Sequence, residues 1–447
     1  AFLVHMSYVA PLALGGERAL TLWAMASGWA EPLFLYVVAR RWLGPLWSAA
    51  LALLLATTPA WLYGAGSGQV EPRLALFAFA GLFAAAEARK TGSLRHAALA
   101  GLMAGFYAGG KFLGLFFVAA AGMVVVLRRD FWRPGIFFAL AALLAGFQWY
   151  LWNYVESGDP MFPGLFRLLG VRNPDFWNAD IDAFLRATTI AGERPGTPAT
   201  LWLFFYPFAA GAGLGYPIWE AGRTGLGPFA LLALPFVLGG LWLFRARLAA
   251  SLLSGVAFGV LFFYVFWFLI APSQRIRHLL PLWPALLLCV AVAAERWAGA
   301  FGQIRLLTAA VALALTLQLA GQTLFTLPYL RRAIEGEGRE AFLARRLIVY
   351  PMVPWINAHL SVDDRLLTME RQLNYYLEKP AYYLLASTRT KPDLRAQSRD
   401  MRRQWSDLRQ LKITHLLLLP GLGEPTPSSA LWRLGRELVA AGCAEVA

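Results

Sequence analysis

Long apolar segments recur along most of the chain, and they constrain its fold more than any other feature. A bilayer core is about 30 Å thick, so a helix needs about 20 mostly apolar residues to cross it. Apolar segments of about this length or longer lie at residues 19–39, 46–63, 72–88, 97–127, 135–155, 227–244, 249–270, 279–294 and 306–327. Only 15% of the 447 residues are charged, against about a quarter in a soluble chain. The sequence therefore predicts a polytopic α-helical membrane protein.

Two of the apolar segments need separate interpretation. Segment 97–127 is too long for one span, and because Gly109 and Gly110 interrupt it we predict a helical hairpin with Lys111 at its tip. That brings the prediction to about ten spans in a multi-span domain of residues 1–330. The shorter run 1–14 is interpreted as the remnant of a lead-in helix. It carries no charged n-region and begins at Ala1, so we expect no signal peptide and a missing natural N-terminus.

Basic residues are distributed unequally between alternate short loops. One set of loops carries Arg40, Arg41, Arg89, Lys90, Arg95, Arg128, Arg129, Arg133, Arg245, Arg247, Arg296 and Arg305. The other set carries only Arg18, Arg73, Lys111, Arg275 and Arg277. The positive-inside rule places the first set in the cytoplasm. It places loop 64–71, Lys111, segment 156–226, residues 272–278 and the C-terminal tail on the outer face. We expect a bacterial inner-membrane protein of the cell envelope, with its C-terminal domain in the periplasm.

The formal net charge of +14 is explained by cytoplasmic loops that face anionic lipid. We therefore expect membrane lipid and no nucleic acid as a partner.

Two regions differ from the apolar spans. Segment 156–226 is too long for a simple connector, and its aromatic stretch 201–208 predicts an interfacial helix. From residue 331 the composition becomes that of a soluble domain. Strands expected at 364–369 and 413–419, with helices at 396–411 and 428–441, predict a small outer α/β domain with a parallel sheet in residues 331–447.

Candidate site residues lie at the outer ends of the predicted spans, where a charge near hydrocarbon usually has a function. Glu71 follows a glycine-rich loop and can coordinate a divalent metal or a sugar hydroxyl. Alternatively, Glu71 is an acid that favours the start of a helix, because Pro72 follows it. Lys111 can bind a lipid phosphate or snorkel to the interface.

A second group of candidates precedes the segment 279–294. Arg275, Arg277 and His278 are three cationic or titratable residues on the predicted outer side. The planar donor fork of arginine suits a phosphate, and the alternative is an interfacial anchor. Asp159, within the turn-rich stretch 152–163, is either catalytic or part of an ordinary Gly-Asp-Pro turn, and the turn is favoured.

Several short stretches carry a family resemblance. They are Gly-Gln-Val-Glu-Pro at 68–72, residues 101–105 and 110–114, Ser-Gly-Asp-Pro-Met-Phe-Pro at 157–163, residues 277–284, and Asn-Tyr-Tyr-Leu at 374–377. Together they resemble the bacterial branch of the GT-C glycosyltransferases, which includes protein O-mannosyltransferase-like and aminoarabinose-transferase-like enzymes. The family pattern often has Asp at the position of Glu71 and Tyr at that of His278.

The resemblance implies transfer of a sugar from a polyprenyl-phosphate donor to a lipid, glycan or protein acceptor at the outer face. It implies a phosphate held by Arg275, Arg277 and Lys111, with His278 also at the substrate, and a sugar or metal oriented by Glu71. The principal catalytic acid of the family lies in a first outer loop that this chain is expected to lack, so no catalytic residue is assigned. No nucleotide cofactor is implied, and a divalent metal stays open. The alternatives are a transporter or lipid flippase and a non-catalytic membrane assembly protein.

Overall fold

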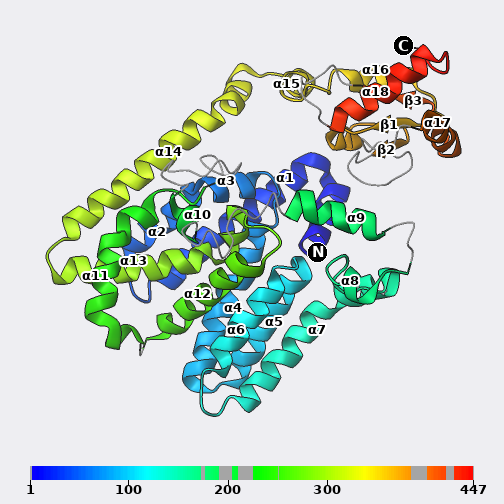
Figure 1. Ribbon diagram of the computed structural model, residues 1–447. Coiled ribbons are helices and arrows are strands. Elements are labelled where there is room, and N and C mark those ends of the chain that lie inside the picture. The colour runs from blue at the N-terminus through cyan, green and yellow to red at the C-terminus, as the bar shows by residue number, and fades with distance from the viewer. Residues whose placement is uncertain are drawn as a thin grey trace. The chain divides into compact units, whose positions relative to one another are not determined.

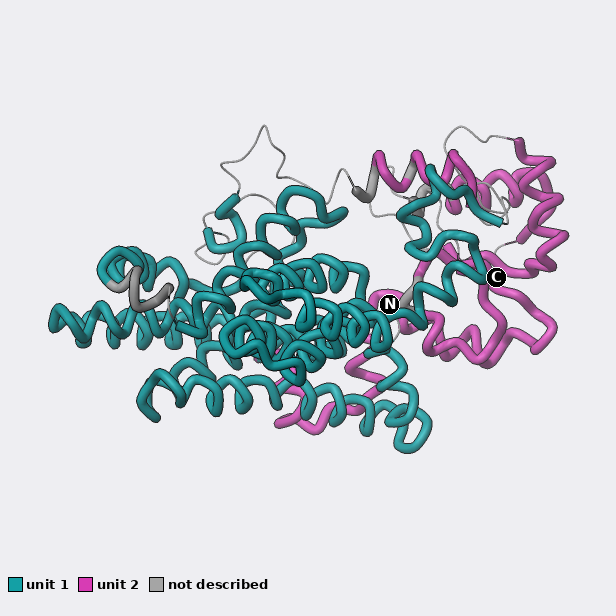
Figure 2. Tube along the Cα trace, turned by 90° about the horizontal axis from the view of Figure 1, so that it is seen from below, with its two compact units in different colours: residues 1–172, 190–326 teal, residues 173–189, 327–447 magenta. Residues whose placement is uncertain are grey.

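The computed structural model describes residues 3–172, 177–190, 204–209, 225–249, 251–383, 400–418 and 427–445. The chain divides into two compact units (Figure 2). The first comprises Ala1–Arg172 and Ile190–Thr326, and the second comprises Asn173–Thr189 and Leu327–Ala447. The predicted outer domain, 331–447, lies within the second unit, and its independence as a soluble domain stays a prediction.

The first unit is helical (Figure 1). Its helices are α1 (Leu3–Ala39), α2 (Pro45–Thr57), α3 (Pro59–Gly66), α4 (Glu71–Thr91), α5 (Leu94–Gly110), α6 (Gly114–Val126), α7 (Trp132–Ser157), α8 (Phe166–Leu169), α10 (Tyr206–Ala209), α11 (Phe229–Ala249), α12 (Leu252–Ile270), the 3₁₀ helix η4 (Ile276–Leu282), α13 (Trp283–Ala300) and α14 (Ile304–Glu335). The boundary between the units falls within α14.

Five segments among the described residues are long and apolar enough to cross a membrane. They are Leu3–Ala39, Trp132–Ser157, Leu252–Ile270, Ile276–Ala300 and Ile304–Glu335. The bent pair α2–α3 adds a sixth if it is one span. The chain is thus an integral membrane protein, but the predicted ten spans are not confirmed. One reason is length, since α5 has 17 residues and α6 has 13, which at 1.5 Å per residue reach about 25 and 20 Å.

The predicted hairpin of residues 97–127 consists of α5 and α6, with Lys111 in the turn between them. Helix α5 also lies side by side with α7 (Figure 1). Glycines permit this close approach, because a Cβ at Gly101 would lie 2.1 Å from the carbonyl oxygen of Phe138, and one at Gly105 would lie 2.3 Å from that of Ala142. Small residues at such spacing are typical of helix interfaces in membranes.

The structure adds detail to three sequence expectations. Residues 46–63 were expected to form one span, and they bend by 63° between α2 and α3, because Pro59 disfavours helical geometry at Thr58. The span predicted at 279–294 lies within the candidate span Ile276–Ala300, which begins with the 3₁₀ turn of η4 that contains Pro281. Of the interfacial helix expected at 201–208, the described part contains α10 (Tyr206–Ala209), and residues 201–203 lie outside the described residues.

The second unit contains a small parallel sheet. Its strands β1 (Leu366–Thr368), β2 (Ala381–Tyr383) and β3 (His415–Leu416) are in the order β2-β1-β3. Leu366 pairs with Ala381 on one side and His415 on the other, both in parallel. The other elements are α9 (Ala179–Phe184), the π-helix η1 (Leu185–Ile190), α15 (Arg339–Arg346), α16 (Met352–His359), the 3₁₀ helix η5 (Arg371–Tyr375), α17 (Met401–Gln410) and α18 (Pro427–Ala440).

Alternate residues of β1 point into different cores, as strand geometry requires. Leu366 packs in a cluster with Val353 and Ile356 of α16, while Leu367 packs with Leu408, Leu431, Leu434 and Leu438 of α17 and α18. Helices therefore cover both faces of the sheet. The predicted parallel pairing is present, although the strands have only two or three residues.

Candidate functional site

Helix α4 begins at Glu71, and its first turn is set by Pro72. Proline fixes φ near the helical value and lacks the N–H that a first-turn residue leaves unused. The preceding loop turns through Gly68, whose φ of 71° is a left-handed value suited to glycine. Glu71 is 4% exposed. A buried carboxylate is costly unless it is paired, so its partners are decisive.

The first partner is Lys111, from the turn between α5 and α6. Its Nζ lies 2.5 Å from Oε1 of Glu71. The turn is tight, because a Cβ at Gly114 would lie 2.3 Å from the backbone nitrogen of Ala108. The hairpin predicted from the sequence thus places Lys111, at its tip, next to the first residue of α4.

The second partner is Arg277 of η4. Its Nε lies 3.6 Å from the same oxygen, Oε1 of Glu71. Three residues selected from separate stretches of the sequence therefore meet at one carboxylate oxygen. We refer to Glu71, Lys111 and Arg277 as the Glu71 cluster.

His278 and Arg275 adjoin the cluster. His278 is buried, and its Nδ1 lies 3.3 Å from the carbonyl oxygen of Ser273. Because a carbonyl only accepts, Nδ1 carries the proton in this contact. Lys111, Arg275 and Arg277 all act electrostatically on this imidazole. The structure thus brings His278, with Arg275 beside it, close to the two cations that contact Glu71.

Arg73 has a role that the sequence analysis did not assign. Its guanidinium donates to Ser27 Oγ at 3.0 Å, to the carbonyl of Gly64 at 3.2 Å and to that of Ala65 at 3.0 Å. It also donates to the carbonyls of Ala24 and Gln69. These bonds tie α1, the end of α3 and the following loop 67–70 to α4, so Arg73 holds the loop that precedes Glu71. The sequence did contain a signal for this role. Arg73 stands beside a glycine-rich loop, and the carbonyls of a loop have no secondary-structure partners, so they need other donors.

Tyr8 of α1 strengthens this attachment. Its hydroxyl donates to the carbonyl of Gly68 at 2.9 Å, and the Arg73 guanidinium lies 5.6 Å from the centre of its ring. The loop conformation is therefore fixed from α1 as well as from α4.

Asp159 is fully buried, but its partners belong to its own loop. One carboxylate oxygen accepts the N–H of Met161 at 2.8 Å and the other accepts that of Leu165 at 2.9 Å. Ser157 Oγ accepts the N–H of Asp159 at 3.1 Å. Both carboxylate oxygens of Asp159 thus have a structural role in the turn, which is the alternative that the sequence favoured.

A divalent metal at Glu71 does not fit the donors around it. Two cations contact Oε1 of Glu71, whereas Ca²⁺ and Mg²⁺ take oxygen ligands. Across the described ranges no three His, Cys, Asp or Glu side chains form a group that could hold a metal ion. We therefore derive no step through a metal.

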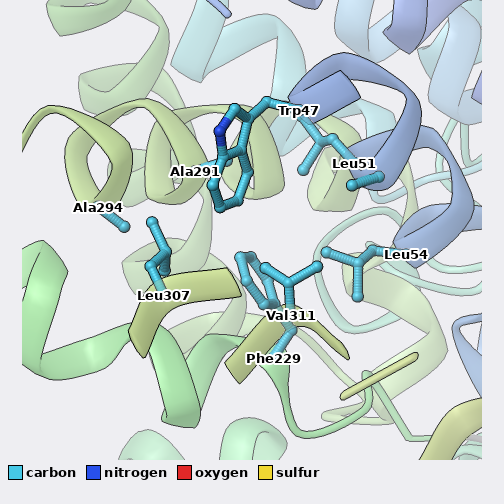
Figure 3. Close-up of a pocket in the computed structure, with 9 residues that line it drawn as sticks. Trp47, Leu51, Leu54, Phe229, Ala291, Ala294, Leu307 and Val311 are labelled. Carbon is cyan, nitrogen blue, oxygen red and sulfur yellow. The ribbon is translucent and has the colours of Figure 1, made fainter. Parts of the chain in front are cut away.

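Two apolar pockets lie elsewhere in the first unit. One is formed by α2, α11, α13 and α14, and Figure 3 shows its side chains turned toward a common space: Trp47, Leu51, Leu54, Phe229, Ala291, Ala294, Leu307 and Val311. It offers no catalytic group. The other adjoins η4 and is lined by Leu279 and Leu282, together with Phe208, Leu226, Val260, Tyr264, Trp283 and Leu286.

These features define a helical membrane protein with a cation–carboxylate cluster built from α4, the α5–α6 turn and η4. No protein-family model and no curated protein sequence matches the chain. Among solved structures it is similar to the crystal structure of ArnT from Cupriavidus metallidurans in the apo state. The TM-score is 0.53 with 17% sequence identity, and the alignment covers 85% of this chain and 74% of ArnT. This likeness shows that the chain shares the fold of ArnT, in agreement with the aminoarabinose-transferase-like resemblance seen in the sequence.

Proposed function

We propose that this protein transfers a sugar from a polyprenyl-phosphate donor to an acceptor at the outer face of the membrane. The convergence of Lys111 and Arg277 on Glu71 carries the proposal. A cluster of cations with accessible side chains is suited to an anionic headgroup. The fold likeness to ArnT, an aminoarabinose transferase of the GT-C group, supports the same reaction class.

In this mechanism Lys111 and Arg277 bind the donor phosphate, and Arg275 and His278 border the same site. The bond between the anomeric carbon and the phosphate oxygen breaks, and its electron pair stays on that oxygen. The acceptor oxygen forms the new bond from the opposite side, and its proton passes to a general base for which we nominate no residue. Cations placed where the leaving phosphate gains charge stabilise the transition state. Glu71 orients the cations and the sugar.

We further propose about ten spans and the orientation implied by the basic loops. The Glu71 cluster and residues 331–447 then lie on the periplasmic side of a bacterial inner membrane. The sugar and the acceptor are left unspecified.

A transporter or flippase is the second candidate, and one pair of observations favours it. Glu31 is 1% exposed within α1, and neither of its carboxylate oxygens has a hydrogen-bond partner in the part of the chain that the structure describes. Near it, Trp61 of the bent α2–α3 pair donates to the carbonyl of Gly28 at 3.1 Å. Intramembrane acids and broken helices are features of transporters. Movement of a fluorescent polyprenyl phosphate across protein-containing vesicles, without sugar transfer, would favour this candidate.

The proposed function is tested with Arg275→Ala and Arg277→Ala in full-length protein. We expect each variant to insert and fold, and to bind polyprenyl phosphate in vesicles about 10- to 100-fold more weakly, because a charge-assisted contact contributes about 1.5–3 kcal/mol. Transfer from a panel of polyprenyl-phosphate sugars should fall at least as far. Arg41→Ala, at an exposed arginine distant in sequence from the cluster, is the matched control.

Arg277→Lys shows which kind of contact binds the phosphate. Binding should stay weak if the arginine contact is bidentate, and should recover if only the positive charge matters. Full binding and transfer by a well-folded double alanine variant would exclude the phosphate site.

A further inference from the structure

Helix α14 is longer than a bilayer core requires. Its 32 residues reach about 48 Å at 1.5 Å per residue, whereas the hydrocarbon core is about 30 Å thick. The apolar segment predicted from the sequence ends at Leu327, and Tyr329, Arg331 and Arg332 follow it within the same helix. An aromatic residue and arginines directly after a span are typical of the headgroup layer. This pattern places the last turns of α14 at the polar surface of the membrane.

Helix α15 packs against this end of α14. Gly336, with a φ of 67°, ends α14 in the left-handed conformation suited to glycine. The chain then turns back so that the rings of Tyr329 and Phe342 lie 5.7 Å apart. Phe342 is buried, and both residues belong to the second unit. We refer to residues 327–346, which form the end of α14, the turn and α15, as the α14–α15 corner.

Three guanidinium groups surround the ring of Phe342. The guanidinium carbons of Arg332, Arg345 and Arg346 lie 4.6, 5.6 and 6.0 Å from its centre. That of Arg346 also lies 5.4 Å from the centre of the Tyr329 ring. An aromatic face attracts cations, which helps to hold the three positive charges together at one place on the surface.

The carboxylates of the corner engage only some of these arginines. Nη2 of Arg345 lies 2.6 Å from Oε2 of Glu337, and Glu335 also acts electrostatically on Arg345. Nε of Arg332 donates to the backbone carbonyl of Glu337 at 3.4 Å. Within the described part of the chain, neither Arg332 nor Arg346 has a carboxylate at ion-pair distance. Residues 327–346 hold five arginines and three glutamates, so the corner has an excess of positive charge.

An apolar stripe runs beside the arginines. Leu327, Leu330 and Ile334 are exposed, and Ile334 has 82% of its surface accessible. Their spacing of three and four residues places them on one face of α14. A soluble anion would need the arginines alone, whereas a lipid also offers acyl chains to an apolar stripe. The combination therefore favours a lipid over a soluble anion.

We propose that the α14–α15 corner binds the phosphate of an anionic phospholipid at the membrane surface. Arg332 and Arg346 donate charge-assisted hydrogen bonds to the phosphate, and the apolar stripe enters the boundary between headgroups and acyl chains. Helix α15 has only eight residues, too few to be stable by itself, so the bound lipid orders the segment through which the chain leaves the membrane. This site does not depend on the proposed sugar transfer.

The test is amide hydrogen exchange of residues 339–346 in full-length protein. It is measured at low salt in nanodiscs of phosphatidylcholine and in nanodiscs that contain an equal share of phosphatidylglycerol. A ligand that binds the folded form opposes its opening, and each arginine near an anionic surface contributes to the attraction. We expect exchange to be roughly tenfold to thirtyfold slower with phosphatidylglycerol, and the difference to shrink at about 0.5 M salt. Residues 401–410 of α17 should show no such difference.

Variants assign the effect to the two arginines. The double variant Arg332→Ala/Arg346→Ala should lose most of the slowing by phosphatidylglycerol. The matched control Arg402→Ala/Arg409→Ala removes two exposed arginines from α17 and should keep it. Arg332→Lys/Arg346→Lys keeps the charge without the donor fork and should keep part of it. Each protein is compared with itself in the two kinds of nanodisc, so a less stable α15 in a variant does not obscure the result.

Three results would overturn the proposal. The first is equal exchange of residues 339–346 in both kinds of nanodisc for wild-type protein. The second is slowing by phosphatidylglycerol that persists unchanged in the double alanine variant. The third is equal slowing by millimolar inorganic phosphate in nanodiscs of phosphatidylcholine, which would identify a site for a soluble anion.

Discussion

Glu71 and Asp159 are both buried carboxylates at or beside helix ends of the first unit, yet they are held in opposite ways. Asp159 is satisfied by backbone N–H groups two and six residues away in its own loop. Glu71 is satisfied by side-chain cations 40 and 206 positions away in the sequence. A carboxylate held by local backbone stabilises its turn, whereas one held by remote, partly exposed cations joins segments that are far apart in the sequence. The type of partner, rather than burial, distinguishes the two roles.

The largest effect that separates the two acids is expected on stability. Asp159→Ala removes two hydrogen bonds to a charged acceptor and leaves two backbone N–H groups without it, at a cost of about 3 kcal/mol or more. The apparent unfolding temperature in detergent should fall clearly, while polyprenyl phosphate binding per folded molecule stays near the wild-type value. Glu71→Ala should lower the unfolding temperature less, because its partner cations are partly exposed, and should change polyprenyl phosphate binding per folded molecule. Lost binding at an unchanged unfolding temperature in Asp159→Ala would assign Asp159 to the site.

A variant of Arg73 tests whether the loop before Glu71 depends on a side chain outside that loop. The turn at Asp159, in contrast, is held by its own backbone N–H groups. Arg73→Ala removes the donors to Ser27, Gly64 and Ala65 and should cost about 2–3 kcal/mol. Limited proteolysis should then cleave the loop 67–70 sooner than in the wild type. Arg73→Lys should recover only part of this loss, because one ammonium cannot reach all these acceptors. An unchanged cleavage rate in Arg73→Ala would contradict the clamp.

A variant of Lys111 tests whether the cations that contact Glu71 also bind a ligand. Lys111→Ala should weaken polyprenyl phosphate binding about tenfold or more and reduce thermal stability only slightly, because the lysine is partly exposed. Lys111→Arg should restore most of the binding. Lys90→Ala, at the C-terminal end of α4, is the matched control. If Lys111→Ala unfolds the protein yet its folded fraction binds normally, Lys111 is a structural counter-ion only.

The smallest expected effect concerns a third carboxylate, in the second unit. Asp364 accepts the N–H of Ser361 at 2.7 Å and its hydroxyl at 2.8 Å, and these bonds hold the pKa of Asp364 below its usual value. A lowered pKa means that this stabilisation is present above the usual value of 3.8 and is lost as pH falls through the lowered one. Amide exchange of residues 361–368, corrected for its intrinsic pH dependence, should accelerate on acidification in wild-type protein. In Asp364→Asn this acceleration should be smaller. An equal acceleration in the two proteins would contradict the link between protonation of Asp364 and the stability of residues 361–368.

Much of the architecture follows from the sequence because it depends on local pattern. The length of apolar segments, the glycines before Lys111 and the alternation of strands and helices after residue 364 predicted the membrane helices, the α5–α6 hairpin and the parallel sheet. The bend at Thr58 and the 3₁₀ start of the segment 279–294 were missed, although Pro59 and Pro281 lie there, because apolar composition alone does not distinguish a continuous helix from a broken one.

The candidate residues were also chosen from the sequence, since a charge beside hydrocarbon is costly and its presence indicates a role. The sequence by itself thus determined that Glu71, Lys111 and Arg277 need partners. Only the tertiary structure decided that they are one another's partners, and that Arg73 instead binds the backbone of the preceding loop. The physical reason is that an ion pair requires its atoms within about 4 Å. Between remote segments that distance is set by the packing of α4 against α5 and η4, which no local pattern encodes.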